Sequence, residues 1–130
     1  MTDRRPDCVY GILIREGRVF LREMDGGLGL PGGVFRPLAE DRKVELRAHI
    51  WDQLEVEARA VWAQGAFDYR NPDEETDRFS GFYTVWEWEP DPAQGLGRWL
   101  NTDQVAASGL VPSLKILLQS VIATQAVKTT

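Results

Sequence analysis

The sequence is poor in cysteine and in long apolar runs, and each shortage excludes a class of protein. Cys8 is the only cysteine, so neither an intrachain disulfide nor a cysteine-rich zinc cluster can form. A chain without disulfides is typical of a reducing, cytoplasmic compartment. The apolar run that begins at Cys8 is interrupted by Arg15, which makes it too short for a membrane span and unlike a secretory signal. We therefore expect no membrane partner.

Basic residues are also scarce. Lysine and arginine number 15 against 20 aspartates and glutamates, and the net charge is −5. Proteins that bind nucleic acids concentrate basic residues to displace counterions from the phosphate backbone, and no basic stripe occurs here. The sequence therefore predicts no nucleic-acid partner. A phosphorylated small molecule stays compatible with this charge if a metal ion or a local group of arginines compensates it.

The overall composition is typical of an ordinary globular domain. Apolar residues make up 43% of the chain and charged residues 27%, and the 130 residues fit one domain, residues 1–130. Apolar alternation and turn residues predict strands at residues 8–15, 19–21, 56–69, 79–89 and 98–100. Helical spacing predicts a helix from about residue 39 to 55, a short turn from Thr102 to Gly109 and a last helix from Pro112. This order predicts an α+β fold.

The first expected helix has an apolar and a polar arc. At 100° per residue, the apolar arc holds Val44, Leu46, Ile50, Trp51, Leu54 and Ala48, with Arg47 as the exception. The polar arc holds Asp41, Arg42, Glu45, His49, Asp52 and Gln53. The apolar arc is wide, so we expect this helix to pack against more than one layer.

A short motif precedes that helix. Leu30-Pro31-Gly32-Gly33 is followed by an acidic residue, and the helix ends in Leu54-Glu55-Val56. This pattern resembles the box of the Nudix hydrolase family. The resemblance implies a mixed β-sheet flanked by two helices, an α/β/α sandwich. It also implies hydrolysis of a nucleoside diphosphate linked to another group, with Mg²⁺ or Mn²⁺ held by glutamates.

Two alignments to the box are open. The first places Glu40 at the loop glutamate, with one extra residue after Gly33, and His49, Asp52 and Gln53 at the three helix glutamates. It puts Ala48 at the arginine and Glu55 at the glycine. The second has no extra residue and makes Arg47 the arginine, with Ala39, Ala48, Trp51 and Asp52 at the glutamate positions. We favour the first, because Trp51 lies in the apolar arc and the first keeps the polar stripe together.

The first alignment implies a set of site residues. Glu40, His49, Asp52 and Gln53 would hold the metal, and Asp52 and Glu40 would be catalytic. Gly32 and Gly33 would bring backbone close to the phosphates, since glycine removes side-chain clashes. Trp86 could stack on a nucleobase. Because imidazole and amide replace glutamates, we expect Mg²⁺ or Mn²⁺ to bind only weakly.

Three functions follow as alternatives. The first is a hydrolase with reduced or altered activity. The second is an inactive module that binds a nucleotide or a phosphorylated metabolite. The third is an interaction protein in which the aromatic strand from Phe79 to Trp88 forms a homodimer interface.

Overall fold

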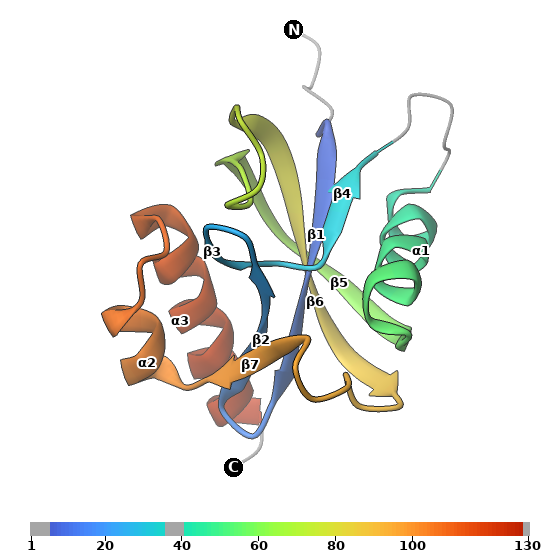
Figure 1. The fold of residues 1–130 in the computed structure, drawn as a ribbon. Helices are drawn as coiled ribbons and strands as arrows, with labels where there is room; N and C mark the ends of the chain where they lie inside the picture. The colour runs from blue at the N-terminus through green and yellow to red at the C-terminus, as the bar shows by residue number, and fades with distance from the viewer. Residues whose placement is uncertain (1–5, 36–40, 129–130) are drawn as a thin grey trace, which may run out of the picture.

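The computed structural model describes residues 6–35 and 41–128 (Figure 1). The strands are β1 (Cys8–Arg15), β2 (Arg18–Met24), β3 (Gly27–Gly29), β4 (Gly32–Val34), β5 (Glu57–Tyr69), β6 (Arg78–Glu89) and β7 (Gly97–Leu100). The helices are α1 (Arg42–Leu54), α2 (Thr102–Ala107) and α3 (Pro112–Lys128). All strands and helices predicted from the sequence are present in the structure, which also contains two short strands, β3 and β4, that were not predicted.

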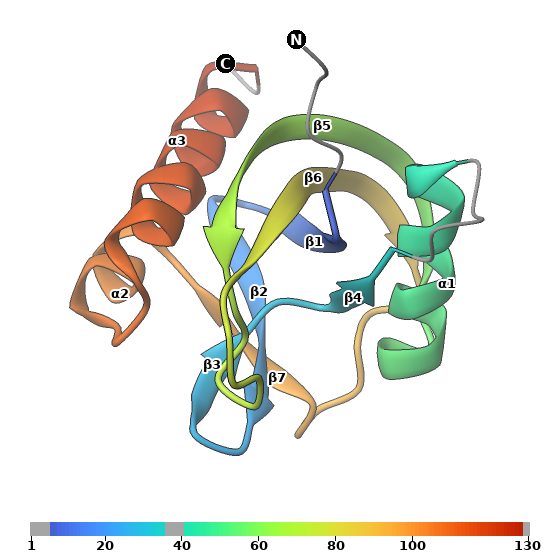
Figure 2. The same ribbon diagram turned by 90° about the horizontal axis from the view of Figure 1, so that it is seen from above.

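The strands form one mixed sheet. Its order is β3-β2-β1-β6-β5, with β4 paired to β1 and β7 paired to β2. The pairing of β1 with β6 is parallel, and the other pairs are antiparallel. Helix α1 lies on one side of the sheet, and α2 and α3 lie on the other (Figures 1 and 2). The predicted α/β/α sandwich is therefore confirmed.

Alternate residues of β1 build a core on each side of the sheet. Tyr10 and Ile12 belong to the core under α3, whereas Val9 and Leu13 belong to the core under α1. This follows from the period of two in a strand, which sends successive side chains to opposite faces. Because both faces are covered, β1 is apolar along nearly its whole length.

Helix α1 begins and ends at clear signals. The side chain of Asp41 accepts hydrogen bonds from the backbone N–H groups of Lys43 and Val44, which caps the first turn. Glu55 adopts a left-handed conformation with φ 56° and donates its N–H to the carbonyl of Trp51.

The predicted faces of α1 were wrong at four positions. Val44, Ala48 and Trp51 were placed in the apolar arc but are exposed, with Val44 at 58% and Trp51 at 54%. Glu45 was placed in the polar arc but is 5% exposed. The buried face centres on Leu46 and Ile50, and α1 contacts β1, β5 and β4. Since β4 consists of Gly-Gly-Val, it offers backbone groups rather than apolar side chains. Polar residues of the helix therefore face inward there.

The later helices differ in detail from expectation. Asn101, and not Thr102, caps α2, because its side chain accepts from the N–H of Gln104 while Gln104 bonds back to the N–H of Asn101. Helix α3 then covers the sheet with Leu114, Leu118 and neighbouring apolar residues. None of the described helices is long and apolar enough to cross a membrane.

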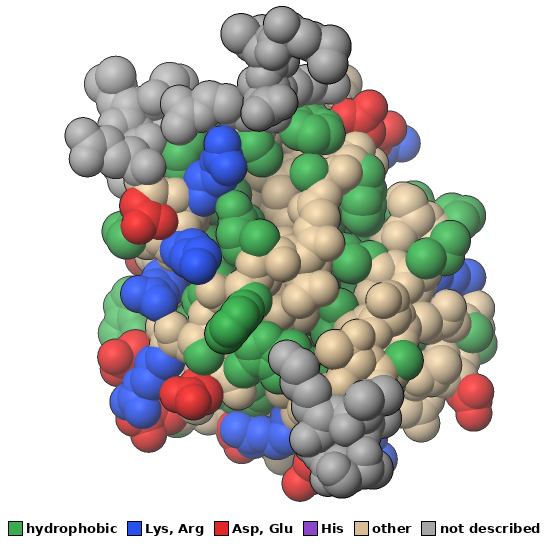
Figure 3. All heavy atoms as spheres, turned by 180° about the vertical axis from the view of Figure 1, so that it is seen from behind, with side chains coloured by type: hydrophobic (Ala, Val, Ile, Leu, Met, Phe, Trp, Pro, Cys, Tyr) green, Lys and Arg blue, Asp and Glu red, His purple; other side chains and the backbone are tan. Residues whose placement is uncertain are grey.

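The aromatic strand does not form an outer surface. β6 lies between β1 and β5, and Phe82 and Val85 on it are fully buried, so the place predicted for a homodimer interface was wrong. The sheet ends instead at β5, where no charged residue occurs between Arg59 and Asp68. The view from behind shows a middle region with few charged side chains (Figure 3). Dimerisation itself stays a prediction.

Candidate functional site

The Gly-Gly motif lies where β4 meets both β1 and α1. Gly32 has φ 144° and pairs with Tyr10, and a Cβ on it would lie 2.7 Å from the Cα of Tyr10. A Cβ on Gly33 would lie 3.1 Å from Cε1 of His49. Glycine is needed at the first position for conformation and for space, and the second glycine makes room for the imidazole. Close packing therefore sets the shape of this loop.

Gln53 ties α1 to the same loop. Its Oε1 accepts the N–H of Gly32 at 2.9 Å, and its Nε2 donates to the carbonyl of Gly32 at 2.7 Å. Oε1 also accepts a hydrogen bond from Nη1 of Arg22 at 3.1 Å. A carboxylate has no donor, so only an amide makes both bonds to Gly32. Glutamine at this position is therefore suited to closing the loop.

The side chain of His49 faces the backbone of β4, whereas the side chain of Asp52 is exposed to solvent. Nε2 of His49 lies 2.9 Å from the carbonyl oxygen of Val34, which can only accept, so Nε2 carries the proton. The imidazole lies over Gly33, and Nδ1 is 3.3 Å from the position of a Cβ there. Asp52 is exposed, and it has no hydrogen bond or ion pair within the described part of the chain.

These residues do not fit a divalent cation. Mg²⁺ and Mn²⁺ require several oxygen ligands that converge in near-octahedral geometry. Here Oε1 of Gln53 already accepts two N–H groups, and the protonated nitrogen of His49 faces a carbonyl. Among the described residues, no group of three or more His, Cys, Asp or Glu could hold a metal ion. Glu40 lies outside the described residues.

Trp86 lies on the other face of the sheet. It is half-buried and packs against the core under α3, together with Phe67 and Leu117. The sheet therefore separates Trp86 from His49 and Gln53 on α1. The structure brings Gly32, Gly33, His49 and Gln53 together, and it does not bring Trp86 to them.

The loop between β5 and β6 holds a buried polar network that was not predicted from the sequence. Asn71 is 3% exposed, and its Oδ1 accepts the N–H of Leu30 at 3.0 Å and the hydroxyl of Tyr69 at 2.8 Å. Its Nδ2 donates to the carbonyl of Leu30 at 3.0 Å. Glu74 extends the network by accepting from the hydroxyl of Tyr10 at 2.7 Å and from the N–H of Asn71 at 3.1 Å. The signal was the turn sequence Asn71-Pro72-Asp73 inside a run that is otherwise charged.

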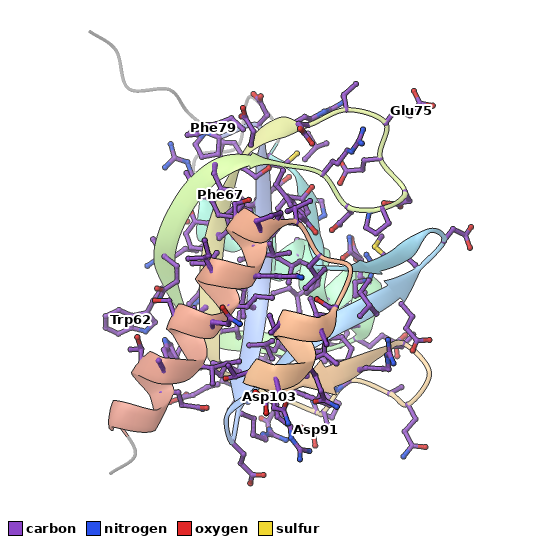
Figure 4. All side chains as sticks on the ribbon, turned by 90° about the vertical axis from the view of Figure 1, so that its left-hand side faces the viewer. Trp62, Phe67, Glu75, Phe79, Asp91 and Asp103 are labelled. Atoms are coloured by element: carbon purple, nitrogen blue, oxygen red, sulfur yellow. The ribbon has the colours of Figure 1, made fainter. Side chains whose placement is uncertain are left out.

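This network forms one wall of a cavity of about 890 Å³. The other walls come from β3, β7, α2 and the turn after α2, and Glu75 lies near the outer end of the loop (Figure 4). Leu28, Leu100, Leu110 and Val111 supply apolar surface, while Arg70, Glu74, Asp77 and Arg98 supply charge. Pockets that bind small molecules have volumes of roughly 300–1,000 Å³ and mix apolar walls with a few polar groups. The volume of this half-open cavity and its mixed lining fall within that range.

The network makes stability fall at alkaline pH. Burial, with smaller contributions from Glu74, raises the pKa of Tyr10 and of Tyr69 above the ordinary value near 10. A phenol whose folded pKa is raised stabilises the fold below its unfolded pKa, and this stability is lost as pH rises. Above pH 10 each tyrosine should therefore cost about 1.4 kcal/mol per pH unit.

Absorbance at 295 nm with circular dichroism checks this prediction. Tyr10 and Tyr69 should ionise only when the protein unfolds, whereas in the urea-unfolded protein all three tyrosines should titrate together near pH 10. Ionisation of both rings near pH 10 in a protein with native circular dichroism would contradict the network.

The geometry agrees with known structures. No protein-family model matches the sequence, and no curated protein is similar to it. A MutT Nudix hydrolase from Burkholderia pseudomallei superposes with a TM-score of 0.70 at 17% identity, over 90% of this chain and 98% of that one. MutT from Bacillus halodurans gives 0.70 at 15% identity, over 88% of this chain and 80% of that one.

A third solved structure carries a ligand. The Nudix domain of Shewanella oneidensis NrtR, in complex with ADP ribose, gives a TM-score of 0.63 at 16% identity, over 92% of this chain and 88% of that one. Identities this low speak for the fold alone. Together with the mixed sheet and its flanking helices, they show that this chain has the Nudix fold.

Proposed function

We propose that this protein binds a nucleotide-type small molecule in the cavity between β3, the β5–β6 loop and α2, without hydrolysing it through a metal on α1. The observation that carries the proposal is the pair of hydrogen bonds between Gln53 and both backbone groups of Gly32. These bonds occupy the amide of Gln53, which the first alignment to the Nudix box places where a metal-binding glutamate is expected. The fold is kept and the metal ligand is replaced.

The cavity supports the nucleotide-type class. Its aliphatic residues offer a surface for a flat ring, and Arg70 and Arg98, whose charges are paired with Asp77 and Glu23 through Nε, present further N–H donors. Gln104 uses its Oε1 in the cap of α2, so its NH₂ group is available as a donor. One solved protein of this fold is complexed with ADP ribose, so the fold accommodates a ligand of this class.

Binding with and without metal tests the proposal. Calorimetry and thermal unfolding would be run with ATP, ADP, ADP-ribose, sugar nucleotides and dinucleotide cofactors, in EDTA and in Mg²⁺, Mn²⁺ or Zn²⁺. We expect one ligand class to bind equally well in EDTA and to be recovered intact by chromatography. Ala107→Trp should abolish binding, because Ala107 lines the cavity. Ala106→Trp is the matched control, since Ala106 is exposed on the same helix and does not line the cavity.

Two results would overturn the proposal. Binding that Ala107→Trp and Ala106→Trp weaken equally would place the ligand outside the cavity. Metal-dependent cleavage that disappears in an Asp52→Asn, His49→Ala double variant would establish the hydrolase alternative, with an unusual working site on α1.

A further inference from the structure

Arg22 is a half-buried arginine in the middle of the sheet-forming region of β2. It lies on β2, between Gly29 of β3 and Gly97 of β7 in the register of the sheet. Both directly opposed residues are glycines, so no cross-strand side chain flanks it. Arg22 is half-buried, and its Nη1 donates to Gln53. The guanidinium is thereby held beside the Gly32 loop.

Among residues 6–35 and 41–128, no carboxylate forms an ion pair with Arg22. Four other arginines in these ranges form ion pairs: Arg15 with Asp91, Arg59 with Glu89, Arg70 with Asp77 and Arg98 with Glu23. Within the described part of the chain, the hydrogen-bonding partner of Arg22 is the neutral amide of Gln53. Burial lowers the pKa of Arg22, and Asp73 offsets this in part without forming an ion pair. A partly desolvated cation with unused donors favours an anionic partner.

We propose that Arg22 is an anion site that receives a phosphate or diphosphate group of the ligand. This inference rests on the proposed function, and it names the group that is recognised and the residue that recognises it. A guanidinium presents paired N–H donors that match two phosphate oxygens. Gln53 holds Arg22 through one nitrogen, which leaves the other donors for the ligand.

The turn that bounds the cavity also approaches Arg22. Asn71 lines the cavity, and a Cβ on Gly29, the residue opposite Arg22, would lie 2.6 Å from the Oδ1 of Asn71. The anion site and the cavity therefore lie at the same turn. One ligand with a ring and a phosphate group could use both.

Inorganic pyrophosphate tests the anion site alone. Its affinity would be measured by calorimetry in EDTA for the wild type, Arg22→Gln, Arg22→Lys and Arg18→Gln. We expect Arg22→Gln to weaken binding at least about tenfold and Arg22→Lys to weaken it less, because lysine keeps the charge but not the paired donors. Arg18→Gln should change little, since Arg18 is exposed on the same strand and its substitution removes the same charge.

The outcomes separate this inference from the proposed function. Equal weakening by Arg22→Gln and Arg18→Gln, or no pyrophosphate binding by the wild type, overturns the anion site. Pyrophosphate binding through Arg22 without any binding of adenosine or ADP-ribose overturns the proposed function and leaves the anion site. Adenosine affinity should be unchanged in Arg22→Gln, which also shows that the variant is folded. If Arg22→Gln does not fold, an Arg22→Lys variant that binds pyrophosphate as tightly as the wild type contradicts paired recognition.

Discussion

Replacing Asn71 with leucine is expected to lower the free energy of unfolding by roughly 3–5 kcal/mol. Leucine has a similar shape but leaves the N–H and C=O of Leu30 and the hydroxyl of Tyr69 without their partner. Each buried polar group that loses its hydrogen bond costs about 1–3 kcal/mol. Urea denaturation followed by tryptophan fluorescence measures the loss. The same variant should lose ligand binding, because Asn71 holds the wall of the cavity.

Asn101→Ala is the matched control. Asn101 is also an asparagine with side-chain hydrogen bonds to backbone, but it is exposed and caps the short helix α2. Its loss should cost only about 1 kcal/mol. If Asn71→Leu destabilised no more than Asn101→Ala, the network would not be holding the β5–β6 loop to Leu30.

Local pattern was enough to locate the five longer strands and the position of α1. The run from Cys8 to Ile14 is apolar because both faces of β1 are covered, and such a run reads as a buried strand in any fold. Asp41 and Glu55 mark the ends of α1 by local chemistry. The two short strands β3 and β4 were not predicted, because their six residues include four glycines that pair only in tertiary context.

The site could not be derived in the same way. Helical spacing placed His49 and Gln53 on a polar stripe, and spacing does not say what faces that stripe. In the structure a strand of Gly-Gly-Val faces it, and both side chains bond to its backbone. Asn71 and Leu30 are far apart in sequence, so their contact has no local signal. Residues whose role depends on a partner across the fold need the structure.

Gln53→Leu is expected to cost roughly 2–3 kcal/mol of unfolding free energy, because both backbone groups of Gly32 and a donor of Arg22 lose their partner. Urea denaturation measures this loss. Exposed Gln94→Leu is the control and should be near neutral. A loss for Gln53→Leu no larger than that of Gln94→Leu would show that the amide does not hold the loop.

Gln53→Glu separates the hydrogen bonds from the charge. A carboxylate can accept from Gly32 and pair with Arg22, so we expect a smaller loss of about 1–2 kcal/mol. It cannot donate to the carbonyl of Gly32, which leaves two oxygens side by side and available to a cation. Millimolar Mn²⁺ should therefore raise the unfolding midpoint of Gln53→Glu by about 2–5 °C and leave the wild type and the charge control Gln94→Glu unchanged. Equal stabilisation of the wild type by Mn²⁺ would mean that the amide of Gln53 does not keep metal from this loop.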